Sequence, residues 1–131
     1  MVDKKKDYGK EGNEYFKEAK QKLEFFGLSN LNLTRGDAAQ EYVNAGEFYA
    51  NAGLNRKSKN AYGKAAEIYV NIAEDVSKKN TSVGHDEIRM NLESALDCYE
   101  KGKFNDKSKH MREDLINLEL SEGKGRSNRY K

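Results

Sequence analysis

The chain has 131 residues, of which 35% are charged and none is proline, and its formal net charge is only +2. This length corresponds to one domain with one modest core, and the proline-free, charge-rich composition favours helices over a loop-rich β-sandwich. Because opposite charges are interspersed along most of the chain, we expect neither a general polyanion binder nor a nucleic-acid binder.

Apolar residues recur at spacings of three and four and predict five helices, over about residues 8–26, 38–52, 56–76, 87–101 and 106–120. Asp37, with Gln40 three residues later, is the expected N-cap of the second helix, and Asn55 that of the third. Gly53 and Gly102 are the expected stops of the second and fourth helices. The expected core includes Tyr15, Ala19, Tyr42, Tyr49, Ala65, Ile68, Ile72, Ala95, Tyr99 and Met111.

The connections predict how these helices pair. Helices two and three, and helices four and five, are joined by only a few residues, so each pair should form an antiparallel hairpin. The polar segment 77–85 is the expected linker between the two hairpins. We expect a single helical-repeat domain over residues 1–121 and a disordered basic tail over 122–131, where Gly, Lys, Arg, Ser and Asn dominate.

An internal repeat with an offset of 50 residues relates the two hairpins. It pairs Tyr49 with Tyr99, Asn55 with Asn105, and the segment Lys57-Ser58-Lys59 with Lys107-Ser108-Lys109. Self-similarity at a fixed period is the signature of stacked helix pairs. The sequence therefore predicts an all-α fold of stacked antiparallel hairpins, in a right-handed superhelix like that of tetratricopeptide repeats.

The first hairpin resembles a tetratricopeptide repeat in its small and aromatic positions. It departs from that pattern at Ala45, where leucine is usual, and at Val70, where proline is usual, and the 50-residue period is too long for a standard array. A divergent relative fits better than a standard repeat. The matching residues are Tyr42, Gly46, Tyr49, Ser58, Tyr62 and Ala65.

Three further segments, in this order, resemble the N-terminal part of the soluble NSF attachment proteins. Glu18-Ala-Lys-Gln-Lys-Leu23 is followed by Phe25-Phe26-Gly27-Leu28, and both match a helix and aromatic loop of that family. The next two family features correspond to the segments 38–49 and 61–67, AAQEYVNAGEFY and AYGKAAE. The resemblance covers residues 8–74 well and the second hairpin loosely.

This resemblance implies a non-enzymatic adaptor that binds SNARE-type helical bundles at membranes during vesicle-mediated, intracellular protein transport. It implies no cofactor, metal or small-molecule substrate. It also implies the NSF-type ATPase as a partner, although the C-terminal helices that dock this ATPase in the family have no counterpart in this sequence. The alternative function is that of a generic tetratricopeptide-like module that binds an unrelated peptide in its concave face.

Phe25, Phe26 and Leu28 are the candidate membrane-contact residues, because the family resemblance implies a loop that dips into the bilayer interface. Lys20, Lys22 and Arg35 lie near in sequence and could attract anionic lipid. The alternative is that the aromatic pair folds back into the core, where each large side chain contributes roughly 1.5–3 kcal/mol. Any membrane contact would be weak, because a few side chains give only marginal affinity.

The repeated lysines Lys57, Lys59, Lys107 and Lys109 are the candidate partner-binding residues. Each pair lies near a helix N-terminus, where a cation opposes the macrodipole, so helix stability does not explain them. The resemblance suggests that they face an acidic coiled-coil bundle, and the alternative is an ordinary solvated surface.

The single cysteine, Cys98, and the two histidines suggest no catalytic or metal site. Cys98 has no disulfide partner within the chain, which indicates a reducing compartment, and we expect it to pack as a half-buried hydrophobe. His85 and His110 lie outside any metal-binding spacing. No apolar run approaches a membrane span, and the basic N-terminus lacks the apolar part of a signal peptide. We expect a cytoplasmic protein, peripheral on membranes.

Overall fold

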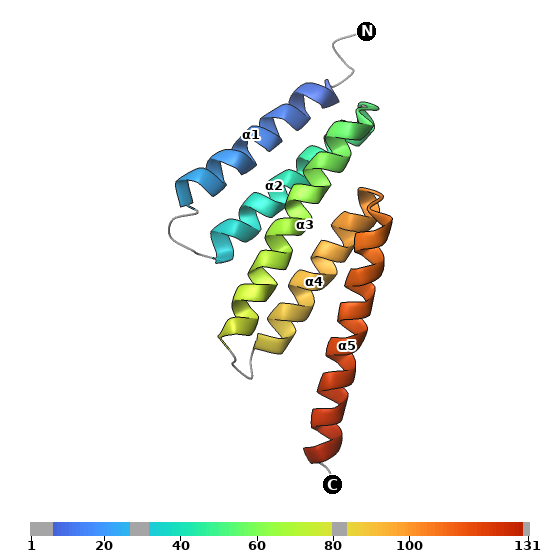
Figure 1. Cartoon of the computed structure of the whole chain (residues 1–131). Coiled ribbons are helices and arrows are strands. Elements are labelled where there is room, and N and C mark those ends of the chain that lie inside the picture. The colour runs from blue at the N-terminus through green and yellow to red at the C-terminus, as the bar shows by residue number, and fades with distance from the viewer. Residues whose placement is uncertain (1–6, 27–31, 80–83, 130–131) are drawn as a thin grey trace.

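The computed structural model describes residues 7–26, 32–79 and 84–129, and every regular element within these ranges is a helix. This confirms the predicted all-α fold (Figure 1). The five helices are α1 (Tyr8–Phe26), α2 (Asn32–Asn51), α3 (Asn55–Lys78), α4 (Gly84–Lys101) and α5 (Asn105–Arg129).

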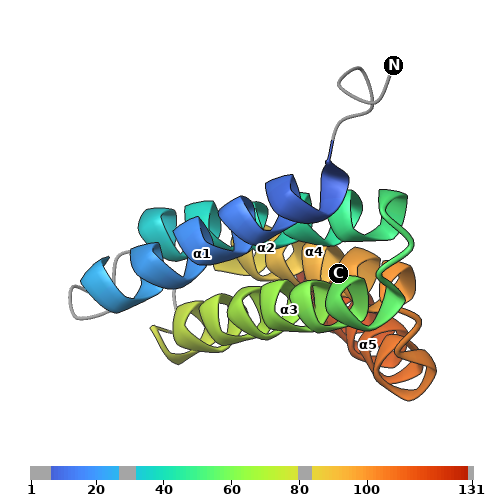
Figure 2. The same ribbon diagram turned by 90° about the horizontal axis from the view of Figure 1, so that it is seen from above.

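The helices form a zigzag stack of hairpins, because each helix packs chiefly against the next one along the chain. Figure 2 shows α1 and α3 on one side of the molecule, with α2 and α4 behind them. The α2–α3 turn and the α4–α5 turn lie at the same end of the stack, where α1 also begins (Figure 1). A stacked helical repeat, as predicted from the 50-residue offset, accounts for this arrangement.

The N-termini of α2 and α3 differ from the predicted ones. α2 begins at Asn32, so Asp37 lies inside the helix and the predicted N-cap was wrong. An ion pair from Arg35 to Asp75 on α3, with N and O atoms 2.7 Å apart, fastens these added residues to the stack. α3 begins at Asn55 itself, and its N-cap is Leu54, which makes no side-chain capping hydrogen bond.

The last two helices are also longer than expected. α4 begins at Gly84 rather than near Glu87. α5 continues to Arg129, past the expected end near Leu120, and so includes most of the segment 122–131 that the sequence predicted as a disordered tail. No proline interrupts this segment, so its backbone amides can continue the helical hydrogen bonding.

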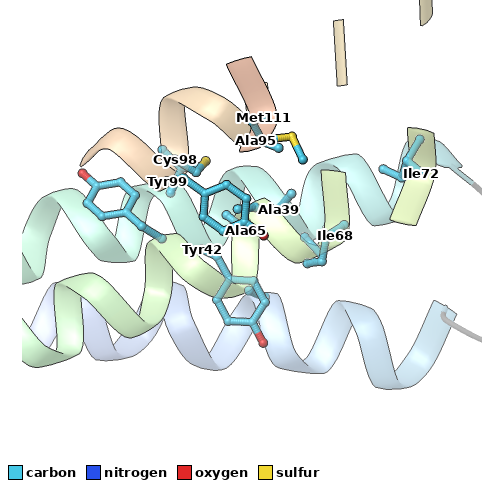
Figure 3. Packing of buried hydrophobic residues seen from close by; sticks show 14 of the residues in the cluster. Ala39, Tyr42, Ala65, Ile68, Ile72, Ala95, Cys98, Tyr99 and Met111 are labelled. Atoms are coloured by element: carbon cyan, nitrogen blue, oxygen red, sulfur yellow. The ribbon is translucent and has the colours of Figure 1, made fainter. Parts of the chain in front are cut away.

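The core is built from alanines that let helices approach and tyrosines that fill the space one turn away. Ala39, Ala65 and Ala95 are fully buried at the contacts between helices, and Tyr42 and Tyr99 are almost fully buried beside them (Figure 3). The predicted core positions are accordingly buried or half-buried. The sequence did not single out Phe16, whose ring packs edge-on against Tyr42 with centroids 5.0 Å apart.

Two glycines inside helices lie in close contact with a tyrosine ring of the neighbouring helix. A Cβ atom on Gly12 of α1 would lie 2.8 Å from the Tyr49 ring, and one on Gly46 of α2 would lie 2.9 Å from the Tyr62 ring. Real Cβ atoms do not approach a neighbour so closely. Each tyrosine ring therefore rests directly on the backbone of the preceding helix, which explains two glycines inside helices despite their low helix propensity.

The two hairpin turns have the same backbone geometry. In the first, the amides of Gly53 and Leu54 donate to the carbonyls of Ala50 and Tyr49, over 3.0 and 2.9 Å. In the second, the amides of Lys103 and Phe104 donate to the carbonyls of Glu100 and Tyr99, over 3.0 and 2.8 Å. These paired bonds define a Schellman motif, which places one residue in the left-handed region. That residue is Gly53 with φ 75° in one turn and Lys103 with φ 61° in the other.

Lys103→Gly should therefore stabilise the chain by about 1 kcal/mol, because a side chain disfavours left-handed backbone and glycine does not. Gly53→Ala at the equivalent position should destabilise it by a similar amount. Urea unfolding of both variants against the wild type measures the two shifts. Equal effects of the same sign would contradict this reading of the turns.

Candidate partner-binding surface at the hairpin turns

The second hairpin turn contacts α3 of the first hairpin through Phe104. The Phe104 ring packs on the backbone of α3, where a Cβ atom on Gly63 would lie 2.8 Å from its Cζ atom. It also meets Tyr99 edge-on, with centroids 5.6 Å apart, which is the hydrophobic contact typical of a Schellman motif. The first hairpin and the second are thereby joined at the end of the stack that carries the repeated lysines.

Three of the four candidate lysines lie over aromatic rings at this end. The Nζ atom of Lys57 is 5.7 Å from the centroid of Tyr49, and that of Lys107 is 5.6 Å from the centroid of Tyr99, its equivalent. Lys59 crosses from the first hairpin to the second and lies 4.8 Å from the centroid of Phe104. Such exposed cation–π contacts contribute about 0.5–1 kcal/mol each and offset the unfavourable helix macrodipole.

The fourth candidate, Lys109, is exposed on α5 one residue beyond Ser108. Its counterpart Lys59 has an aromatic ring from the next turn beneath it, whereas no further hairpin follows Lys109 in the described stack. Lys59 and Lys107 thus lie over the same ring, that of Phe104, whereas Lys57 lies over Tyr49 and Lys109 is exposed on α5.

The charge of these lysines is not neutralised by the surrounding acids. Glu100 accepts from Arg112 over 2.8 Å, and Glu47 and Asp97 both pair with Lys101. Among the described side chains, the four candidate lysines form no ion pair. We name the surface formed by Lys57, Lys59, Lys107 and Lys109 the basic turn end.

Phe25 and Phe26 end α1, far from the basic turn end. Gly9 lies at the other end of α1, next to the first turn, since a Cβ atom on Gly9 would lie 3.2 Å from Leu54. Sixteen residues at 1.5 Å each separate Gly9 from Phe25 by about 24 Å. The side chains of Phe25 and Phe26, and Leu28 as a whole, lie outside the described part of the structure, so their exposure stays a prediction.

The lysines and arginine expected to support a membrane contact differ in their environments. Arg35 forms an ion pair with Asp75, and the Arg35 side chain is only 16% exposed. Its charge is therefore neutralised within the stack. Lys20 is exposed, and Lys22 is half-buried. Of the three, Lys20 is the one left exposed to attract an anionic headgroup.

Cys98 is more deeply buried than expected, at 2% exposure in the core between α3 and α4 (Figure 3). Burial, with the nearby Asp97 carboxylate, raises the pKa of its thiol to about 12, so it stays protonated at neutral pH. His85 lies thirteen residues away on the same helix, or about 20 Å, and the side chain of His110 is 76% exposed. This geometry joins the thiol to neither histidine.

The raised pKa of Cys98 predicts a loss of stability in alkali. A thiol that ionises at about 12 when folded and near 9.0 when unfolded stabilises the fold fully below pH 9 and progressively less up to pH 12. Cys98 alone should lower the free energy of unfolding by about 1 kcal/mol between pH 9 and pH 10. Urea unfolding at both pH values measures this, and in Cys98→Ala the fall should be smaller by that amount. Burial also raises the pKa of five tyrosines above 10.0, so the fall that they cause near and above pH 10 should persist in the variant: Tyr42, Tyr49, Tyr62, Tyr69 and Tyr99.

Two hollows lie away from the basic turn end. One, of about 240 Å³, lies beside Leu23, Tyr42 and Ile68. The other is an open groove of about 580 Å³ between α2, α3 and α4. Within residues 7–26, 32–79 and 84–129, no cluster of three or more His, Cys, Asp or Glu side chains could bind a metal ion. No helix in those ranges is long and apolar enough to cross a bilayer.

The described residues therefore form a stack of antiparallel helix hairpins, and aromatic rings lie beneath three lysines of its basic turn end. Comparison of the chain with models of protein families, with curated proteins and with solved structures gives no match in any of the three.

Proposed function

We propose that this chain is a non-enzymatic adaptor that binds an acidic, SNARE-type helical bundle at a membrane surface, as the soluble NSF attachment proteins do. The observation that carries the proposal is the basic turn end. Lys59 of the first hairpin and Lys107 of the second both lie over the Phe104 ring, 4.8 and 5.4 Å from its centroid, and Lys57 lies over Tyr49. Charge complementarity of this kind sets the orientation and association rate of a partner more than its affinity.

The partner we propose is elongated, because the two candidate surfaces lie at opposite ends of α1. With Phe25, Phe26 and Leu28 at the membrane, the basic turn end would stand about 24 Å away along the helix. A helical bundle that projects from a bilayer spans such a distance, since each turn of helix adds about 5.4 Å. In this proposal the protein is cytoplasmic and peripheral on membranes, and it serves vesicle-mediated transport.

Recruitment of an NSF-type ATPase is part of the family resemblance but has no residues assigned to it in this chain. The proposal is therefore restricted to SNARE binding and membrane contact. The four lysines are assigned to the bundle, and the aromatic loop is assigned to the bilayer.

Co-sedimentation with liposomes that carry an assembled SNARE bundle tests the proposal. Changing all four lysines of the basic turn end to Gln should weaken binding about tenfold or more at low salt, because up to four charge contacts are lost. The control carries the same charge change on exposed lysines elsewhere: Lys17, Lys64, Lys78 and Lys79. Equal binding by both quadruple variants would refute the assignment of the lysines.

One double variant separates the membrane contact from the core alternative. Phe25→Ser/Phe26→Ser should reduce binding to the liposomes while the helical circular dichroism is unchanged. If this double variant loses helicity instead, the aromatic pair belongs to the core, and the membrane assignment is wrong.

A further inference from the structure

The groove between α2, α3 and α4 differs from the basic turn end in charge and in shape. It has a volume of about 580 Å³ and is open to solvent along its length. α2 and α4 contribute polar and acidic side chains, and α3, which packs against both helices, contributes Tyr69 and Ile72. Its lining residues are Gly36, Asp37, Gln40, Tyr69, Ile72, Glu87 and Asn91.

The 50-residue repeat places carboxylates at matching positions of α2 and α4. Asp37 is matched by Glu87, and Glu47, ten residues further along α2, is matched by Asp97. Lys101 joins the second of these pairs: its Nζ atom lies 3.9 Å from Glu47 and 3.1 Å from Asp97. The chain therefore shows how one cation is held between equivalent carboxylates of the two helices.

The pair Asp37 and Glu87, which lines the groove, has no such cation. Lys101 lies four residues after Asp97, but the residue four positions after Glu87 is the neutral Asn91. The Asn91 amide donates to the backbone carbonyl of Glu87 over 2.8 Å. Among the described residues, neither Asp37 nor Glu87 takes part in an ion pair. Asp37 and Glu87 thus both line the groove as exposed carboxylates outside any described ion pair.

We infer that this groove binds a basic peptide segment of a partner protein. A lysine or arginine of the segment lies between Asp37 and Glu87, as Lys101 lies between Glu47 and Asp97. An apolar side chain two positions along the extended segment, on the same face of the peptide, packs on the half-buried ring of Tyr69. The Gln40 amide nitrogen donates one hydrogen bond to Asn44 over 3.1 Å, and its oxygen and second hydrogen are left for the peptide backbone. This site is independent of the proposed SNARE-type function, which uses the basic turn end and an acidic partner.

Binding of a fluorescent peptide to the full chain tests the inference. The probe is a peptide of about eight residues in which serine separates alternating arginine and leucine residues, so that an extended chain turns both toward the groove. The matched probe has citrulline in place of arginine, which keeps the shape and removes the charge. We expect the arginine peptide to bind about tenfold or more tightly than the citrulline peptide at low salt. Equal affinities would overturn the inference.

Three variants place the binding in the groove. Asp37→Asn/Glu87→Gln should weaken the arginine peptide about tenfold, whereas Glu113→Gln/Asp114→Asn, with the same charge change on exposed positions of α5, should not. Asn91→Lys supplies the missing cation from the chain itself, so it should weaken the peptide while the thermal midpoint is unchanged or higher. Full affinity in Asn91→Lys, or equal losses in the two double variants, would show that the peptide binds elsewhere and refute the site. Loss of SNARE-bundle binding would not affect these results, so the two proposals fail separately.

Discussion

Phe104→Ala is expected to lower the free energy of unfolding by about 3 kcal/mol, near the lower end of the range for phenylalanine-to-alanine changes because the ring is half-buried. The change removes the ring that rests on Gly63 and packs edge-on against Tyr99. It also removes the aromatic face beneath Lys59 and Lys107. Chemical denaturation monitored by circular dichroism measures the loss.

Leu54→Ala is the matched control for Phe104→Ala, because Leu54 occupies the same position in the first turn. Leu54 is 38% exposed and contacts the start of α1, so its truncation should lower the free energy of unfolding by about 1 kcal/mol or less. If the two truncations prove equally destabilising, Phe104 does not hold the hairpins together in the way the structure indicates.

Gly46→Ala is expected to lower the free energy of unfolding by about 1–3 kcal/mol, although alanine is the better helix former. The added methyl group would lie 2.9 Å from the Tyr62 ring, which is only 5% exposed and has little room to move. Overpacking at this contact therefore outweighs the gain in helix propensity. Thermal and urea unfolding of the variant measure the net effect.

Gly36→Ala, in the same helix, gives the opposite expectation. A Cβ atom on Gly36 meets no atom within 4 Å, so only the propensity gain of about 0.5–1 kcal/mol applies and the variant should be stabilised. A stabilised Gly46→Ala variant would show that α2 and α3 can separate without loss, contrary to the close packing in the structure.

The sequence was sufficient to predict the hairpins and the core, because both follow from short-range patterns. Tyr42, Ala65 and Tyr99 lie on apolar rows at helical spacing, and the 50-residue offset identifies the two turns from the sequence alone. The positions at which helices begin were less predictable. Asp37 has the chemistry of an N-cap, but the tertiary ion pair of Arg35 with Asp75 extends α2 past it.

The environment of the repeated lysines could not be read from spacing alone. Lys59 and Phe104 are 45 residues apart, and only the packing of the second turn on α3 brings the Lys59 Nζ atom within 4.8 Å of the ring centroid. The signal available in the sequence was the apolar residue that follows each helix stop, Leu54 or Phe104, since this residue makes the hydrophobic contact of a Schellman motif. The groove between α2, α3 and α4 was missed for the same reason, because Asp37 and Glu87 line it from two different helices.

Titration of the wild-type chain with an assembled SNARE bundle in solution, at low and at physiological salt, tests the adaptor proposal most directly. We expect saturable binding that weakens as salt rises, because the basic turn end attracts the bundle through charges that salt screens. The separated, unassembled SNARE segments should bind more weakly than the bundle. Absence of binding at low salt, or equal binding of bundle and separated segments, would contradict the proposal that this helical stack is a SNARE adaptor.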